Sequence, residues 1–141
     1  MTESKHIWAP LRDNLRDPHW ERIENSAGRG RPDVNGCLRG HVVDVELKIF
    51  HGRQLVFREG QPVWIHKRAW AGGRVFVLAR AGDVLYLYQA VEVVGSSVPR
   101  TLLANGDTAY TVLDVVSPLC VCPRPFNWKA LQAYMFFGDH K

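Results

Sequence analysis

The sequence predicts an α/β domain with a mixed β-sheet flanked by helices, and three observations carry this prediction. Residues 40–50, GHVVDVELKIF, alternate apolar and polar side chains with the period of a β-strand. Residues 58–73 follow helical spacing. Residues 74–80 and 84–94 form two further apolar runs around a short turn. With one more strand before residue 40, the order strand, strand, helix, strand, strand is typical of an α/β core.

Length and composition are those of one ordinary globular domain. The chain has 141 residues, enough to bury a core, and 46% of them are hydrophobic and 23% charged. The net charge of +4 and the pI of about 9.2 favour an anionic partner such as nucleic acid. The first ten residues have no apolar signal region, and no apolar run reaches the ~18 residues of a membrane span. We therefore expect a cytoplasmic protein without a membrane partner.

The cysteines indicate a reducing compartment. Cys37, Cys120 and Cys122 are an odd number without disulfide-like spacing. Cys120 and Cys122 form a C-x-C pair, but no second pair completes a tetrahedral zinc set, so a metal is not expected there.

The segment before the long strand is polar and irregular. Residues 1–19 are expected as a loose arm holding one short helix near Leu11–Arg16. Residues 19–25, HWERIEN, could be a short strand or a helix end, with Ile23 facing inward. Residues 26–32 must be irregular, because their glycines and proline break either period.

The long strand has an apolar and a polar face. The turn-like residues 35–40, NGCLRG, predict that Asp33–Asn35 pairs with it as a hairpin. Because side chains alternate across a strand, one face is apolar and the other polar, and we expect a half-buried strand. The apolar face holds Val43, Val45 and Leu47, and the polar face holds Asp44, Glu46 and Lys48.

The following helix and the C-terminal elements have recognisable ends. Pro62 suits the first turn of the helix within 58–73, and the glycine pair 72–73 ends it. Residues 109–116 predict another strand. Residues 127–138 predict a helix with Asn127 as its N-cap, ended by Gly138.

The whole chain is expected to be a single domain, 1–141, with a core of about residues 19–95. Residues 96–141 are expected as a small C-terminal extension and a candidate oligomer contact. The contact is suggested by Tyr134, Met135 and Phe136, which are more apolar than a lone final helix needs.

The polar face of the long strand can be interpreted as a metal centre. Glu46 and Lys48 project together, and pairing brings Asp33 to the same end of the sheet, where Glu24 can join it. Converging carboxylates repel one another unless a cation such as Mg²⁺ binds them, and Mg²⁺ prefers oxygen ligands. Such an ion lowers the pKa of a bound water, which can then attack the phosphorus atom. A lysine beside it offsets the negative charge that grows on the phosphate in the transition state. The alternative is a solvated sheet face with a cross-strand ion pair.

These residues also resemble a known family. RPDV…VDVELK, as P-D-x(12)-E-x-K, resembles the signature of the PD-(D/E)XK nuclease superfamily. Gln61 matches a glutamine of the branch that holds archaeal-type Holliday junction resolvases and VRR-NUC nucleases, and GGRVFVLAR resembles the strand that closes that core. The resemblance covers about residues 19–90 and implies a restriction-endonuclease-like core.

The resemblance also implies roles for individual residues. Glu24, Asp33, Glu46 and the Leu47 carbonyl would bind metal, Lys48 would be the catalytic lysine, and Gln61 would position Lys48 or the scissile phosphate. Glu21 is an alternative to Glu24 as the first acid. The implied cofactor is Mg²⁺, for which Mn²⁺ is expected to substitute.

Basic residues near this centre are candidates for DNA contact. Four lie in flanking loops: Arg29, Arg31, His51 and Arg53. On the helix, Lys67 and Arg68 could meet phosphates or form an ordinary solvated face. Asp44 is expected to be solvated, and Trp64 and Trp70 are expected in the core or a groove wall.

The sequence thus favours a Mg²⁺-dependent, structure-selective DNA endonuclease, with a Holliday junction resolvase as the leading hypothesis. A four-way junction has approximate twofold symmetry, so a resolvase should act on branched DNA as a C2 homodimer. One alternative is a VRR-NUC-like replication and repair nuclease that cuts flaps or single strands as a monomer. Another is a non-catalytic DNA-binding module, disfavoured because the whole acid-acid-lysine set is present. By analogy, the compact form and the RIEN…PDV pattern favour a phage source.

Overall fold

A six-stranded mixed β-sheet forms the centre of the protein. The structure is a computed structural model that describes residues 1–23 and 30–138. The strand order is β1-β2-β3-β5-β6-β9; β3 and β5 are parallel, and every other neighbouring pair is antiparallel. The strands are β1 (His19–Arg22), β2 (Val34–Leu38), β3 (His41–Ile49), β5 (Arg74–Ala81), β6 (Val84–Gln89) and β9 (Cys120–Pro123). The predicted α/β fold with a mixed sheet and the hairpin before the long strand are confirmed.

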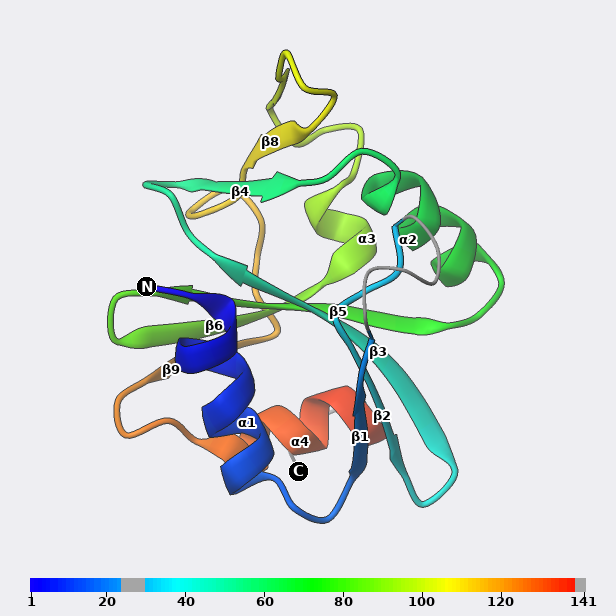
Figure 1. Ribbon diagram of the computed structural model, residues 1–141, viewed down its shortest axis with the longest axis vertical. Helices are drawn as coiled ribbons and strands as arrows, with labels where there is room; N and C mark the ends of the chain where they lie inside the picture. Colours follow the sequence, from blue (N-terminus) through cyan, green and yellow to red (C-terminus); the bar gives the residue numbers. More distant parts are fainter. Residues whose placement is uncertain (24–29, 139–141) are drawn as a thin grey trace.

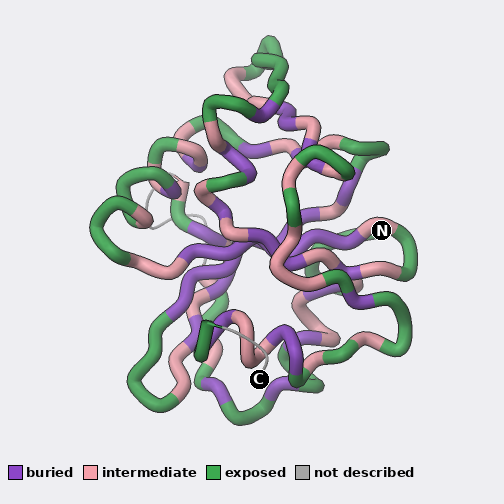
Figure 2. Tube along the Cα trace, turned by 180° about the vertical axis from the view of Figure 1, so that it is seen from behind, coloured by how far each residue is buried: buried purple, intermediate pink, exposed green. Residues whose placement is uncertain are grey.

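Both faces of this sheet are covered (Figure 1). On one face lie η1 (Ser4–Trp8), α1 (Ala9–Asn14) and α4 (Trp128–Phe137). On the other face lie α2 (Gln61–Trp70), α3 (Ala90–Val93) and a second sheet of β4 (Gln54–Phe57), β8 (Thr108–Thr111) and β7 (Arg100–Leu102), in that order. The chain therefore builds two apolar layers, one on each side of the central strands, which Figure 2 shows as the buried middle of the molecule.

The two longer helices begin and end where the sequence predicts. Pro62 lies in the first turn of α2, and Gly72, at φ +92°, follows its end. The Asn127 side chain accepts a hydrogen bond from the Ala130 amide at 3.1 Å, and Gly138 ends α4 in the left-handed region at φ +86°. None of the helices in the described part of the chain has the length and apolar character to cross a membrane.

Several predicted boundaries are wrong. Residues 90–93 are helical, although 84–94 was expected as one strand, because a short apolar run fits a buried strand and a buried helix equally well. The strand expected over 109–116 ends at Thr111. The arm expected to be loose is helical from Ser4 to Asn14. Ile7, Leu11 and Leu15, at i, i+4 and i+8, are buried against the sheet and hold it there.

The C-terminal residues take part in the main sheet and its cover. β9 is the edge strand beside β6, and α4 packs against the face that η1 and α1 also cover. Met135 and Phe136, expected to mark a partner surface, are both 0% exposed and belong to the core of the chain itself. Their apolar character is therefore explained by packing within the chain.

The close packing of β2 against β1 gives a test of this arrangement. A Cβ at Gly36 would lie 2.4 Å from Trp20 Cζ3 and 3.1 Å from Phe136 Cζ, two rings held edge-to-face with centroids 5.6 Å apart. We expect Gly36→Ala to lower the free energy of unfolding by about 1–3 kcal/mol, the usual cost of overpacking. Urea denaturation measures this, with Val42→Ile, which lengthens a side chain that is 47% exposed on the neighbouring strand, as the control for an added carbon. Equal stability of Gly36→Ala and wild type would contradict the packing.

Candidate active site

The polar face of β3 is buried. Asp44, Glu46 and Lys48 are 3%, 2% and 9% exposed, whereas a half-buried strand was expected. Their side of the sheet is covered by α2 and by the small sheet of β4, β8 and β7, which come from later parts of the chain. A buried carboxylate and a buried ammonium are costly unless each has partners, so these side chains require a specific local arrangement.

Gln61, the first residue of α2, supplies that arrangement. Its amide nitrogen Nε2 donates to Glu46 Oε2 at 2.9 Å, and its Oε1 accepts from Lys48 Nζ at 3.2 Å and from the Arg58 backbone amide at 2.7 Å. Lys48 Nζ also lies 3.8 Å from Glu46 Oε1 and 4.6 Å from the centre of the Phe57 ring. Glu46, Lys48 and Gln61 therefore form one closed network, and the amide fixes the positions of both charged groups.

Asp33, directly before the start of β2, joins this network. Val34, the first residue of β2, pairs with Val45 of β3. Beyond that point the Leu47 amide donates instead to Asp33 Oδ2, at 2.9 Å. In a strand the N–H and C=O of one residue point to the same side. The Leu47 carbonyl therefore also points to the edge where Asp33 lies.

Burial and the neighbouring acid change the proton affinity of Glu46. Its pKa is raised well above the ordinary value, first by burial and next by a hydrogen bond with the Asp33 carboxyl group. The nearby Lys48 charge and the Gln61 amide act in the opposite direction, and the Asp33 charge adds to the increase. Asp33 and Glu46 are thus a close carboxyl pair that favours a cation, either a proton or a metal ion, between them.

The raised pKa predicts how stability depends on pH without metal. A carboxyl group whose folded-state pKa is raised stabilises the fold most below its unfolded-state pKa, and this contribution is lost as the pH rises through the folded-state value. In EDTA, we therefore expect the free energy of unfolding of the wild type to decrease as the pH rises from weakly acidic to mildly basic. Glu46→Gln should make this decrease smaller. Urea denaturation at several pH values measures this difference. A wild-type curve parallel to that of Glu46→Gln would show that Glu46 does not titrate abnormally.

Asp33, Glu46 and Lys48 face a polar cavity of about 390 Å³, whereas Gln61 is buried and is not part of its lining. Its lining residues are Glu3, Arg22, Asp33, Glu46, Lys48, Ile49, His51, Val56 and Arg58. His51 was expected near the centre and lies there. Sequence reasoning missed Glu3, Arg22 and Arg58. The helical spacing of Ile7, Leu11 and Leu15 is the signal that could have placed Glu3, because it predicts a helix across the sheet.

Other predicted residues are not brought to this cavity. Glu24 and Arg29 lie outside the described residues. Glu21 pairs with Asn35 of β2, which in turn pairs with Asp44 of β3, and it does not line the cavity. The next residue, Arg22, lines the cavity instead. The Arg53 guanidinium donates to the Leu113 carbonyl at 3.0 and 3.2 Å, so it links the turn before β4 to the segment after β8.

The basic residues of α2 lie on a separate surface. Lys67 and Arg68 are exposed, as is Arg31 in the loop before β2. Arg68 Nε binds Asp44 Oδ2 at 3.2 Å, and Asp44 also accepts from Asn35 Nδ2 at 3.0 Å, so Asp44 is not solvated as expected. Trp70 is 93% exposed rather than in the core or a groove wall, because it lies on the outer side of α2.

Among solved structures, the chain is similar to Archaeoglobus fulgidus Hjc, a Holliday junction resolvase from an archaeal hyperthermophile. The TM-score is 0.51 at 12% sequence identity, and the match covers 77% of this chain and 83% of that one. The two proteins share a fold. The predicted restriction-endonuclease-like core is thereby confirmed. No family model and no curated protein matches the sequence.

The residues present suit a hard divalent cation. Asp33 and Glu46 offer carboxylate oxygens at one edge of the sheet, with the Leu47 carbonyl directed to the same edge. Within residues 1–23 and 30–138, no three His, Cys, Asp or Glu side chains gather closely enough to hold a metal ion. Mg²⁺ often keeps several waters and needs only one or two carboxylates from the protein, so two are enough.

Proposed function

We propose that this protein is a metal-dependent DNA endonuclease that cuts branched DNA, with a four-way junction as the preferred substrate. One observation carries the proposal: Asp33, Glu46 and Lys48 meet at one end of β3, where Gln61 binds Glu46 and Lys48 and the Leu47 amide binds Asp33, on a fold shared with an archaeal Holliday junction resolvase. A solvated ion pair would not need a buried amide that binds both of its charges.

The metal ligands would be Asp33, Glu46 and the Leu47 carbonyl. Glu3 lines the same cavity but does not complete a three-carboxylate site with Asp33 and Glu46, because no such group gathers within the described residues. When bound, Mg²⁺ or Mn²⁺ would polarise the scissile phosphate and lower the pKa of the attacking water. The protein's own task is to hold the Asp33 and Glu46 carboxylates ready for the ion, whose binding requires both of them to be deprotonated.

Lys48 would act on the phosphate directly. Its ammonium group lies beside Glu46 at the floor of the cavity and is held by the Gln61 amide and the Phe57 ring. A donor fixed in this way stabilises negative charge as it grows on the phosphate oxygens, at no cost of reorganisation. Arg22, His51 and Arg58, in the cavity wall, are the groups that would position the DNA backbone.

The choice of a junction rests on shape and symmetry. The chain is basic overall, and a protein of this size has little surface for reading base edges, so selectivity would come from the form of the DNA backbone. Two symmetric nicks across a junction require two active sites, which implies a C2 homodimer.

Cleavage of four end-labelled substrates tests this proposal: a four-way junction, a flap, a single strand and a linear duplex, each with Mg²⁺ and with EDTA. The expected result is metal-dependent paired nicks in the junction, with a dimer in sedimentation at the same protein concentration. Preferential cutting of flaps or single strands by a monomer would favour the replication and repair nuclease. Binding of every substrate without any cleavage would favour the non-catalytic module.

A further inference from the structure

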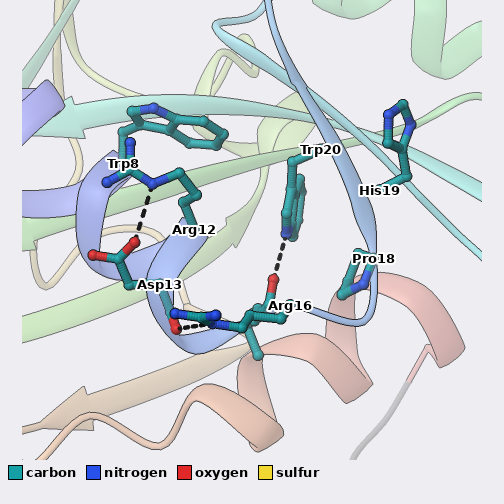
Figure 3. Close-up of a pocket in the computed structure, with 8 residues that line it drawn as sticks. Trp8, Arg12, Asp13, Arg16, Pro18, His19 and Trp20 are labelled. Carbon is teal, nitrogen blue, oxygen red and sulfur yellow. Dashed lines mark hydrogen bonds and ion pairs between the residues drawn. The ribbon is translucent and has the colours of Figure 1, made fainter.

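A second pocket of about 450 Å³ lies between the N-terminal helix and the start of β1 (Figure 3). Its lining residues are Trp8, Arg12, Asp13, Leu15, Arg16, Pro18, His19 and Trp20, and we call it the Trp8–Trp20 pocket. It combines two indole rings with two guanidinium groups and an imidazole, and the metal centre proposed above uses none of them.

The two indole rings are held in fixed positions. Trp20 Nε1 donates to the Leu15 carbonyl at 2.9 Å, and the Trp20 ring packs edge-to-face on Phe136. Trp8 packs against the same core cluster, and both rings remain only half-buried. Figure 3 shows them on two sides of the pocket, with Arg12 close to Trp8. Rigid, partly exposed aromatic rings are platforms on which a base can stack.

The charges around the rings suit a phosphate. Arg12 and Arg16 are exposed, and both are bound by Asp13: Arg12 Nε by its carboxylate at 3.1 Å, and Arg16 Nε by its backbone carbonyl at 3.2 Å. The Arg12 and Asp13 side chains are 54% and 57% exposed, so this ion pair is weak and can be exchanged for a contact with phosphate.

The Trp8–Trp20 pocket and the proposed nuclease cavity are built on the same two elements. Glu3 lies at the cavity end of the N-terminal helix and Arg12 at the pocket end, nine residues or about 14 Å away. On β1, Trp20 faces the pocket and Arg22 the cavity, and Arg22 also binds the Ser4 hydroxyl at 2.6 Å. At about 3.4 Å per nucleotide of a stacked strand, the separation is that of about four nucleotides.

We propose that the Trp8–Trp20 pocket binds an unpaired base and its adjacent phosphate, on the DNA strand that the cavity cuts and within about four nucleotides of the scissile bond. The position of the scissile bond in this proposal rests on the proposed function. A paired base cannot stack on the two rings without leaving the duplex, which costs free energy. The pocket would therefore favour DNA with unstacked nucleotides near a branch.

Binding of a fluorescent twelve-nucleotide oligothymidylate, and of a duplex of the same length, tests the pocket in EDTA, where no cleavage is needed. Trp8→Leu is expected to weaken binding of the single strand between about fivefold and 150-fold, the effect of losing one stacked base. Arg12→Gln with Arg16→Gln, which changes only exposed side chains, is expected to flatten the slope of log affinity against log salt by about 1.4. Duplex binding should change less in both variants.

The matched control is Arg100→Gln with Lys129→Gln, which removes the same charge from exposed positions on β7 and α4. Its affinity for the single strand should stay close to that of wild type, in contrast to that of the Arg12 and Arg16 variant. Wild-type affinity of the Arg12 and Arg16 variant for the single strand, or equal losses for single strand and duplex, would overturn the proposal. A loss specific to the single strand would support the pocket even in a protein that cuts nothing. Metal-dependent cleavage together with unchanged single-strand binding would refute the pocket alone.

Discussion

Glu46→Gln is expected to reduce DNA cleavage by about 10³-fold or more while DNA binding is retained. The substitution keeps the size of the side chain and the oxygen that accepts from Gln61 Nε2, so the network around Gln61 should persist. It removes one of the two carboxylates that would hold the metal. Loss of several kcal/mol of transition-state stabilisation by the ion corresponds to a rate loss of this size. Single-turnover cleavage of a four-way junction, with binding measured in EDTA, separates the two effects.

Asp44→Asn is the matched control for Glu46→Gln. Asp44 is the other buried acid on the same face of β3, but its partners are Asn35 and Arg68 rather than the cavity residues. It should cleave at close to the wild-type rate. Equal losses in the two variants would indicate that the effect comes from disturbing β3, and full activity of Glu46→Gln would exclude Glu46 as a metal ligand.

Lys48→Met is expected to reduce the rate of cleavage about 10²- to 10³-fold, the usual effect of removing one preorganised donor to a transition state. Methionine fills the same apolar space beside Phe57, and Lys48 is not one of the proposed metal ligands. Mg²⁺ affinity should therefore change much less than the rate. Single-turnover rates across a Mg²⁺ titration measure both quantities in one experiment.

Lys67→Met provides the contrast, because Lys67 is an exposed lysine on α2 and does not line the cavity. It should change DNA affinity and its salt dependence, with an unchanged rate at saturating protein. Wild-type turnover by Lys48→Met would exclude Lys48 from the chemistry. A rate restored by raised Mg²⁺ would assign Lys48 to metal binding instead.

Local sequence patterns were enough to predict the strands and the helix that hold the candidate active-site residues. Alternation identified the strand of Glu46 and Lys48, and the turn before it placed Asp33 directly before the neighbouring strand. Pro62 and the glycines after Trp70 located α2 and therefore Gln61. These features depend on residues close together in the chain, which is why sequence alone could find them.

Features that depend on distant parts of the chain could not be predicted in this way. The polar face of β3 was expected to be half-exposed, but the small sheet that covers it includes β8 and β7, more than fifty residues later. β4, β7 and β9 have only three or four residues each, too few to show a period. Glu3 was missed for a different reason: its helix was visible in the spacing of Ile7, Leu11 and Leu15, but the polar composition of the arm outweighed it.

We propose that a divalent metal ion held by Asp33 and Glu46 allows this protein to cut DNA. The most direct measurement is cleavage of an end-labelled four-way junction by metal-stripped wild-type protein without metal, and after addition of Mg²⁺ or Mn²⁺. We expect no cleavage without metal and paired nicks after either ion is added. Cleavage at the same rate in EDTA, or binding of the junction with no cleavage in either metal, would contradict it.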